Sequence, residues 1–297
     1  MKVIENISLH QRRSSELILR EDGSLYHLGI LPEDVADEVI IVGDPDRVEV
    51  ISQRFDEVEI RKSSREFAFH TGTLNGTRIS VLSSGIGVDN IDIVINEIDA
   101  AVNCDLQTRI PRSKRRIINF TRIGTCGCMQ ADVAVGTFVA SSFAIGIDGV
   151  PWFYGAELEQ EENELLQHFL DHVHWPRNLA TPYVVKADQT LLNRMSFAQA
   201  GITFTANGFY GPQQRELMLP LGFPNMFGEL KSITFKNLRL INFEMECAGI
   251  YALASMLGHR AVTVCAILAN RAVGEFADDP SVHVNRLIDK VLEGLTR

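Results

Sequence analysis

Two glycine turns that follow strand-like runs carry an arginine suited to holding a small anion. In the first, the apolar run IIV is followed by Gly43, an Asp-Pro step and Arg47. Glycine lets an anion approach the main chain, and the guanidinium is a forked donor that fits phosphate oxygens. Asp-Pro turns followed by an arginine are also common on protein surfaces, so this turn alone leaves both explanations open.

The second turn lies in the run TRIGTCG and places Arg122 three residues before Thr125. A guanidinium at the buried end of a strand is costly unless it meets an anion. A threonine beside it can donate its hydroxyl and its backbone N–H to the same phosphate. The run differs from the pattern GxxxxGK[ST], so it does not imply a nucleoside triphosphate.

Two further segments lie where a strand gives way to a helix. Ser83–Gly87 (SSGIG) precedes a helix expected from Val88, and its glycines serve either tight packing or a role beside the substrate. Asn242–Ala248 (NFEMECA) leads into an apolar helix. Its acidic residues either complement the helix dipole or allow Glu246 to accept hydrogen bonds from the vicinal hydroxyls of a ribose.

Strand-like runs alternate with helical patterns, as expected when helices link parallel strands. The predicted strands are Glu38–Val42, Thr77–Ser83, Arg116–Ile123, Thr137–Ala144, Pro182–Val185, Ile202–Ala206 and Ala261–Leu268, and the predicted helices are Val88–Val102, Glu162–His172, Glu246–Leu257 and Val282–Leu295. No repeat, low-complexity tract or flexible linker divides residues 1–297. We therefore expect a single three-layer α/β/α domain whose sheet carries functional residues at the strand ends.

The composition is that of a soluble protein with a sizeable core, because 45% of the residues are hydrophobic and 22% are charged. No run of about 18 apolar residues exists, and residues 1–20 lack a signal-peptide stretch, which predicts a cytoplasmic protein that does not bind membranes. The net charge of -10 argues against nucleic-acid binding, since a phosphate backbone is held mainly by clustered Lys and Arg.

Two local clusters each have two explanations. Five cysteines without CxxC or zinc spacing predict reduced, buried thiols, and a redox role for Cys126 and Cys128 is the alternative. Five basic residues crowd around Pro111 and predict a solvated surface loop, with a subunit contact or an anionic partner as the alternative. The basic residues are Arg109, Arg112, Lys114, Arg115 and Arg116.

Taken together and in this order, these segments resemble the nucleoside phosphorylase family, and most closely its uridine phosphorylases. The resemblance runs from His27-Leu28-Gly29 to Asn270-Arg271 and covers most of the chain. Its most specific parts are Gly43–Val48 (GDPDRV), Ser64–Phe67 (SREF), Arg122–Thr125 (RIGT), Phe209–Arg215 (FYGPQQR) and Phe243–Glu246 (FEME). The resemblance implies a three-layer α/β/α single domain with a mixed central sheet. The implied reaction is the reversible phosphorolysis of uridine to uracil and ribose 1-phosphate.

The resemblance also assigns site residues, of which Arg122, Glu246, Gln213 and Arg215 are expected to act in catalysis. Phosphate is expected among Gly43, Arg47, Arg122 and Thr125, with Arg65 reaching in from a neighbouring subunit. The ribose is expected beside Met245, Glu246 and the neighbour's His27, which lies by the 5′-hydroxyl. The base is expected beside Cys126, Phe209, Gln213 and Arg215, with Arg271 as a more distant support.

These assignments suit the chemistry of cleaving an N-glycosidic bond. The sugar acquires oxocarbenium character and the leaving base acquires negative charge, so both charges need partners. Phosphate below the ring supplies an anion near the sugar, and Gln213 with Arg215 can hydrogen-bond the carbonyls and ring nitrogen of uracil as charge accumulates.

The residue after the late strand favours a pyrimidine over a purine. Purine-cleaving relatives usually carry an aspartic acid there, whereas this chain has Asn270, which cannot act as an acid. Three departures from the family pattern bear on the preference for sugar and base: Val42 for proline, Cys126 for threonine or serine, and Val88-Asp89-Asn90 for a Gly-Pro-Ser-like turn.

The resemblance implies no required cofactor, with inorganic phosphate as the co-substrate, and a homo-oligomer. Relatives also bind a monovalent cation such as K+ at positions matching Glu66, Ile86 and Asn90. The segments 1–26 and 103–116 are an N-terminal extension and a basic insertion relative to compact bacterial relatives. An intersubunit site predicts a dimer as the smallest active unit, and the resemblance extends this to a hexamer. The alternatives are a nucleosidase, a purine or methylthioadenosine phosphorylase, and a non-catalytic nucleoside-binding protein.

Overall fold

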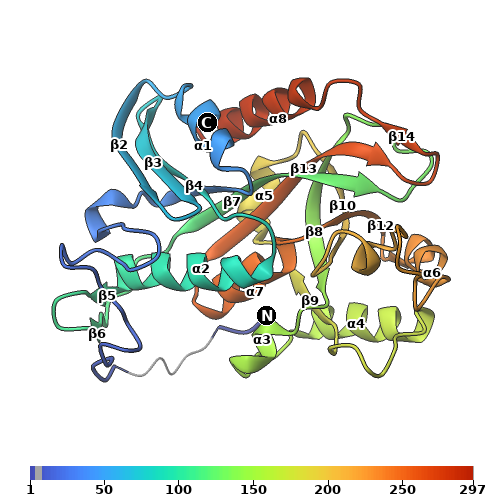
Figure 1. The fold of residues 1–297 in the computed structure, drawn as a ribbon, viewed down its shortest axis with the longest axis horizontal. Helices are drawn as coiled ribbons and strands as arrows, with labels where there is room; N and C mark the ends of the chain where they lie inside the picture. The colour runs from blue at the N-terminus through green and yellow to red at the C-terminus, as the bar shows by residue number, and fades with distance from the viewer. Residues whose placement is uncertain (4–8, 297) are drawn as a thin grey trace.

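Apolar runs rich in β-branched residues form one 12-stranded mixed sheet in the computed structural model, which describes residues 1–3 and 9–296 (Figure 1). The strands are β1 (Glu38–Val42), β2 (Glu57–Ser64), β3 (Phe67–Leu74), β4 (Thr77–Ser83), β7 (Asn119–Cys128), β8 (Phe138–Gly146), β9 (Tyr183–Lys186), β10 (Gln199–Thr205), β11 (Thr234–Phe235), β12 (Leu238–Glu244), β13 (Arg260–Asn270) and β14 (Glu275–Phe276). Two short strands, β5 (Cys104–Asp105) and β6 (Ile110–Pro111), form a separate hairpin.

The sheet curls until two distant strands meet. The main path runs β11-β12-β10-β8-β13-β7-β1-β4-β3-β2, and β12 also pairs antiparallel with β7 through Asn242 opposite Cys128 and Phe243 opposite Gly127. Strands β7, β13, β8, β10 and β12 therefore form a closed ring. This closure brings the end of β12 against the C-terminal half of β7.

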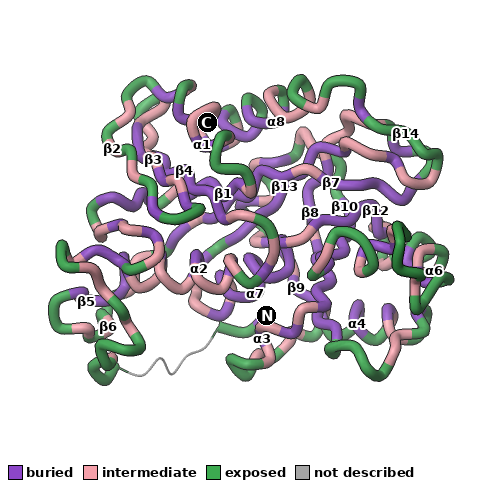
Figure 2. The backbone as a smooth tube through the Cα atoms, viewed as in Figure 1, coloured by how far each residue is buried: buried purple, intermediate pink, exposed green. Residues whose placement is uncertain are grey.

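Helices cover both faces of the sheet (Figure 1). They are α1 (Pro45–Ser52), α2 (Val88–Asn103), α3 (Val150–Phe153), α4 (Gln160–His172), α5 (Gln189–Arg194), α6 (Met226–Ser232), α7 (Cys247–Met256) and α8 (Pro280–Leu295), with short 3-10 turns η1 (Pro32–Asp34) and η2 (Gly211–Gln213). One core lies under α2 and α7 and another under α1 and α8. In α2 the buried positions include Ile91, Val94, Ile95 and Ile98, a helical spacing that turns one stripe toward the core (Figure 2).

Local sequence fixes where the helices beside the strand ends begin. The carboxylate of Asp44 accepts a hydrogen bond of 3.0 Å from the backbone N–H of Asp46, and Pro45 occupies the first helical position of α1. Asp279 caps α8 in the same way, with Pro280 following it. A capped helix, α1, therefore follows the first glycine turn.

Most predicted elements are found, with shifted ends. Strands β1 and β4 have the predicted bounds, whereas the strand predicted from Arg116 starts at Asn119 and continues to Cys128. The β2–β3 hairpin was not predicted, because charged residues alternate along β2 at the edge of the sheet. The helix predicted at Glu246–Leu257 is present as α7 from Cys247 to Met256, and the residues Asn242–Glu244 before it end the strand β12, which was not predicted.

The structure shows the surroundings of the five cysteines and of the basic segment 109–116. All five cysteines are free and buried, as predicted. The basic segment is not wholly solvated: Arg115 pairs with Asp99, and Nε of Arg116 lies 2.5 Å from Oδ1 of Asp37. In the described part of the chain, no helix is long and apolar enough to cross a bilayer.

Candidate active site

A cavity of about 650 Å³ opens where β1, β4 and β12 end beside β7. The parallel strands β1 and β4 end together, and a Cβ atom at Gly43 would lie 3.3 Å from the carbonyl oxygen of Gly85. The two glycine turns therefore approach each other closely. The predicted residues that line the cavity are Gly43, Arg47, Glu66, Ile86, Arg122, Thr125, Cys126, Phe209, Gln213, Arg215, Met245 and Glu246.

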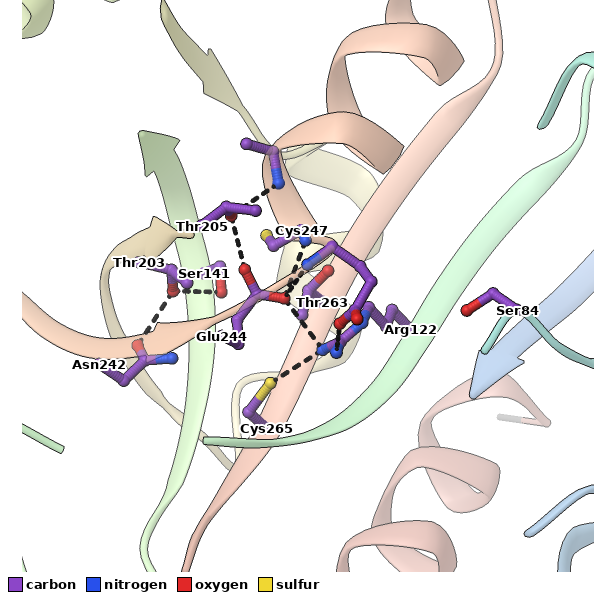
Figure 3. Close-up of polar contacts among 12 residues, drawn as sticks. Ser84, Arg122, Ser141, Thr203, Thr205, Asn242, Glu244, Cys247, Thr263 and Cys265 are labelled. Carbon is purple, nitrogen blue, oxygen red and sulfur yellow. Dashed lines mark hydrogen bonds and ion pairs between the residues drawn. The ribbon is translucent and has the colours of Figure 1, made fainter. Parts of the chain in front are cut away.

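Arg122 lies buried in the cavity wall, with 5% of its surface exposed. Its Nη2 pairs with the carboxylate of Glu246, and its Nη1 lies 3.3 Å from Oε2 of Glu244 and donates to Sγ of Cys265 (Figure 3). Burial disfavours the charged guanidinium, but the two carboxylates outweigh this effect and raise the pKa of Arg122 well above its usual value. The negative charge that a buried Arg122 requires is supplied by the chain itself.

Glu246 joins two walls of the cavity from its position just before α7. One carboxylate oxygen pairs with Arg122, and the other accepts a 2.7 Å hydrogen bond from the backbone N–H of Gly87. Gly87 has a φ of 101°, a conformation that favours glycine, and it immediately precedes α2. These contacts fix the Glu246 carboxylate beside Arg122, where its lone pairs can accept hydrogen bonds from sugar hydroxyls.

Glu244 is a functional candidate that the sequence reasoning missed. Its Oε1 accepts a 2.5 Å hydrogen bond from Oγ1 of Thr205, and its Oε2 accepts hydrogen bonds from the backbone N–H groups of Glu246 and Cys247 (Figure 3). Burial raises the pKa of Glu244, although Arg122 opposes this shift. The spacing of Glu244 and Glu246 was the available signal, because residues two apart on an extended chain share a face.

Arg47 presents the opposite situation to Arg122. It lines the cavity, and no described carboxylate forms an ion pair with its guanidinium. Burial lowers the pKa of Arg47, Asp44 partly offsets this, and Arg122 adds repulsion. A half-buried guanidinium without a paired carboxylate would be stabilised by an anion that enters the cavity, and Thr125 lines the same cavity.

The cavity is also lined by Phe209, Gln213 and Arg215. The guanidinium of Arg215 lies 3.9 Å from the centre of the Phe209 ring, donates a 2.9 Å hydrogen bond to the Phe209 carbonyl, and donates to Oε1 of Gln213. Burial lowers the pKa of Arg215. A Cβ atom at Gly127 would lie 3.2 Å from Nη2 of Arg215, so glycine on β7 leaves room for this side chain.

Arg271 lies behind this segment and does not line the cavity. Its guanidinium donates hydrogen bonds to the backbone carbonyls of Gln213 and Gln214 and lies 4.9 Å from the centre of the Phe227 ring. Burial, with repulsion from Arg215, lowers the pKa of Arg271 to about 10. The role of Arg271 as a more distant support of the base stays a prediction.

A sequence model of the phosphorylase superfamily matches residues 38–293. The chain belongs to the phosphorylase superfamily. This membership confirms the resemblance seen in the sequence, and the mixed α/β fold agrees with it.

Individual members of the superfamily are similar to this chain over nearly all of its length. Uridine phosphorylase of Thermococcus kodakarensis is 32% identical over 266 residues, which cover 89% of this chain and 83% of that protein. A DeoD-type purine nucleoside phosphorylase of Brevibacillus brevis is 25% identical over 270 residues, covering 90% and 97%. The crystal structure of a Trypanosoma brucei nucleoside phosphorylase, reported to show uridine phosphorylase activity, superposes with a TM-score of 0.86 at 29% identity and covers 94% of this chain and 99% of that one.

His27 and Arg65 lie outside the cavity of their own chain in this superfamily member. They are nevertheless close to each other, because Tyr26 lies between them. The guanidinium of Arg65 is 5.2 Å from the centre of the Tyr26 ring and donates to its hydroxyl at 3.2 Å, while the Tyr26 and His27 rings meet edge to face at 5.0 Å. The two residues predicted to serve a neighbouring subunit thus form one surface unit.

Asn270 is held away from the cavity by its own hydrogen bonds. Its amide nitrogen donates to the carbonyls of Gln130 at 2.9 Å and Val133 at 2.8 Å, and its oxygen accepts from the N–H of Ala272. Asn90 likewise is absent from the cavity lining, although its amide lies close to Gly85. Among residues 1–3 and 9–296, no group of three or more His, Cys, Asp or Glu side chains has the arrangement of a metal site.

Proposed function

We propose that this chain is a uridine phosphorylase, which transfers the ribosyl group of a pyrimidine nucleoside to inorganic phosphate. One observation carries the proposal: a single cavity is lined by Arg47, which forms no ion pair with a described carboxylate, by the Arg122–Glu246 pair and by the Gln213–Arg215 pair. The cavity thus combines an anion site and a base site with the carboxylate of Glu246, which can accept hydrogen bonds from sugar hydroxyls. The uridine phosphorylase names of two similar proteins support the same reading.

The proposed phosphate site consists of the backbone at Gly43, the side chains of Arg47, Arg122 and Thr125, and Arg65 from a partner subunit. Phosphate competes with Glu246 for the guanidinium of Arg122, which frees that carboxylate to accept hydrogen bonds from the ribose 2′- and 3′-hydroxyls. Met245 contacts the sugar beside it. A phosphate oxygen then forms the new bond to C1′ while the bond from C1′ to N1 of the base breaks.

The electron pair of the broken bond stays on the departing uracil. Arg215 and Gln213 donate hydrogen bonds to the carbonyls and ring nitrogen of that base, with Phe209 packed against its ring and Cys126 beside it. Arg271 supports the Gln213 and Gln214 carbonyls from behind. Because these donors are fixed before the reaction, they stabilise the charge that develops in the transition state.

The active unit in this proposal is a dimer, and three such dimers would build a hexamer. The position of the Tyr26, His27 and Arg65 unit outside its own cavity supports this. In the dimer, Arg65 completes the phosphate site of the partner, and His27 lies by the ribose 5′-hydroxyl. A monovalent cation at Glu66, Ile86 and Asn90 belongs to the same interface proposal, because Glu66 and Ile86 line the cavity.

We assign the enzyme to nucleoside catabolism and pyrimidine salvage in the cytoplasm. Five free cysteines support a reducing compartment. A purine substrate is disfavoured because the Asn270 amide is fully used by backbone groups and offers no acid to a purine ring. A nucleosidase is disfavoured because Arg47 would then have no anion.

The test is to incubate the purified protein with uridine, thymidine, inosine and adenosine, each with and without phosphate, and to follow base release. Uracil released only with phosphate is the expected result. Release of a base without phosphate indicates a nucleosidase, and release of a purine base indicates a purine or methylthioadenosine phosphorylase. Nucleoside binding without any release indicates a non-catalytic binding protein, and each of these three results contradicts the proposal.

A further inference from the structure

One carboxylate outside the cavity holds the histidine that the proposed function assigns to the partner's ribose. Glu97 lies on α2 and uses both of its oxygens on the segment that carries His27. Its Oε1 lies 2.5 Å from Nδ1 of the His27 ring and accepts the backbone N–H of His27 at 3.2 Å. Its Oε2 accepts the backbone N–H of Leu28 at 2.9 Å.

The contact with Glu97 determines which nitrogen of the His27 ring carries the proton. A carboxylate accepts hydrogen bonds, so its contact with Nδ1 favours the ring form with the proton on Nδ1. In the neutral ring this leaves a lone pair on Nε2, for which no described residue is a partner. The His27 side chain is 31% exposed, so the ring is accessible from outside the chain.

The backbone of the same residue is fixed independently of Glu97. The carbonyl of His27 accepts hydrogen bonds from Oγ of Ser64 and from Nη2 of Arg20, the latter at 3.4 Å. Removal of the Glu97 carboxylate therefore leaves the segment attached to β2. What Glu97 adds is the hydrogen bond to the ring itself, which fixes the nitrogen that carries the proton and, with the packing of Tyr26, the rotation of the ring.

We propose that Glu97 is a positioning residue for ribose recognition: it fixes the Nδ1–H form of His27 and presents Nε2 to the 5′-hydroxyl of the nucleoside in the partner subunit. The inference rests on the proposed function, since it names a residue that acts through His27 on the same substrate. Glu97 itself touches neither the nucleoside nor the phosphate.

The experiment compares uridine with 5′-deoxyuridine, which lacks the hydroxyl in question. Glu97→Gln is expected to lower kcat/KM for uridine about tenfold, mainly by raising KM. A change of about tenfold corresponds to the loss of one hydrogen bond to the substrate. With 5′-deoxyuridine the same variant is expected to match the wild-type protein. In a His27→Ala background, adding Glu97→Gln is expected to have no further effect on uridine.

A matched control is present elsewhere in the chain. Glu229 clamps His174 in the same way, accepting its backbone N–H at 2.9 Å and lying 2.7 Å from its Nδ1. Glu229→Gln is expected to leave kinetics with both substrates unchanged, and thermal unfolding of both variants shows whether they fold. In the wild-type protein, nitrogen NMR of 15N-labelled histidine, assigned with His27→Gln, reports the form of the ring directly.

Equal losses for Glu97→Gln with both substrates would overturn the proposal in favour of a purely structural role, and so would an unaltered uridine reaction. A wild-type His27 ring protonated on Nε2 alone would overturn it even if the variant fails to fold. A wild-type protein that does not phosphorolyse uridine contradicts the proposed function instead, and the wild-type control separates that result from the others.

Discussion

Arg122 on β7 and Glu246 before α7 form a buried ion pair in the wall of the cavity. Both side chains are nearly inaccessible, at 6% and 4% exposure, and Glu244 flanks the pair on the Arg122 side. If Arg122 binds phosphate as proposed, we therefore expect this pair to affect both stability and binding. Arg47, with which no described carboxylate forms an ion pair, is expected to affect binding alone.

Arg122→Ala is expected to abolish phosphorolysis and also to destabilise the fold. Removing the cation leaves Glu244 and Glu246 buried without a counter-charge, which costs about 3–5 kcal/mol. Chemical denaturation and the uridine assay measure the two effects. A variant with wild-type stability would show that the two carboxylates do not depend on Arg122.

Arg47→Gln is expected to raise the KM for phosphate about 10- to 100-fold without loss of stability. This change in KM corresponds to the loss of one charge-assisted hydrogen bond. Stability is retained because no described carboxylate forms an ion pair with this guanidinium, so the substitution breaks none. Initial rates at varied phosphate concentration, with thermal unfolding alongside, provide the measurement. An unchanged phosphate KM would remove Arg47 from the proposed site.

The raised pKa of Glu244 predicts a particular pH dependence of stability. The unfolded chain loses this proton near the ordinary value of 4.5, whereas the folded chain keeps it to higher pH. The folded state then binds more protons, so this group makes stability fall as pH rises from about 4.5 until the folded-state pKa is passed. The free energy of unfolding of the wild type relative to Glu244→Gln should fall over that range, and a flat or rising difference contradicts the assignment.

Gly127→Ala is expected to weaken the reaction by displacing Arg215. The new methyl group would lie 3.2 Å from Nη2 of Arg215, which can move because it ends a flexible side chain. We expect kcat/KM for uridine to fall about tenfold, equivalent to one hydrogen bond, with stability retained. Gly228→Ala, where an added Cβ meets nothing within 4 Å, is the control. Normal turnover in Gly127→Ala would argue against a base-contacting Arg215.

Mixed subunits test the intersubunit site. Arg65→Ala and Glu246→Gln proteins are each expected to be nearly inactive. Random exchange of subunits in dimers should restore about a quarter of the wild-type activity, since half of the dimers then contain one intact site. No recovery despite demonstrated exchange would place Arg65 in the site of its own chain.

Asn270→Asp is not expected to create a purine phosphorylase. The new carboxylate would face the carbonyl oxygens of Gln130 and Val133, which now accept hydrogen bonds from the amide. Loss of those bonds and the buried charge should destabilise the fold by about 2–4 kcal/mol. Adenosine and inosine assays with thermal unfolding provide the check, and efficient purine cleavage would contradict the expectation.

Local pattern accounts for much of the fold and for part of the site. The bounds of β1 and β4 follow from apolar runs that end in turn residues, and Asp44 with Pro45 determines where α1 begins. Strand β12 escaped prediction because Asn242 and Glu244 make it look polar, whereas in the fold their polar groups meet Thr203 and Thr205. Such partners come from another strand and have no trace in the local sequence.

By itself, the sequence determined the residue types at the strand ends, the capped helices and the resemblance that assigned their roles. Only the tertiary structure decided which of the arginines are neutralised: closure of β12 onto β7 gives Arg122 two carboxylates, while no carboxylate of the described residues forms an ion pair with Arg47. It also decided that Tyr26, His27 and Arg65 gather outside the cavity. The physical reason is that the energy of a buried charge depends on its neighbours in space, and segments more than a hundred residues apart supply them here.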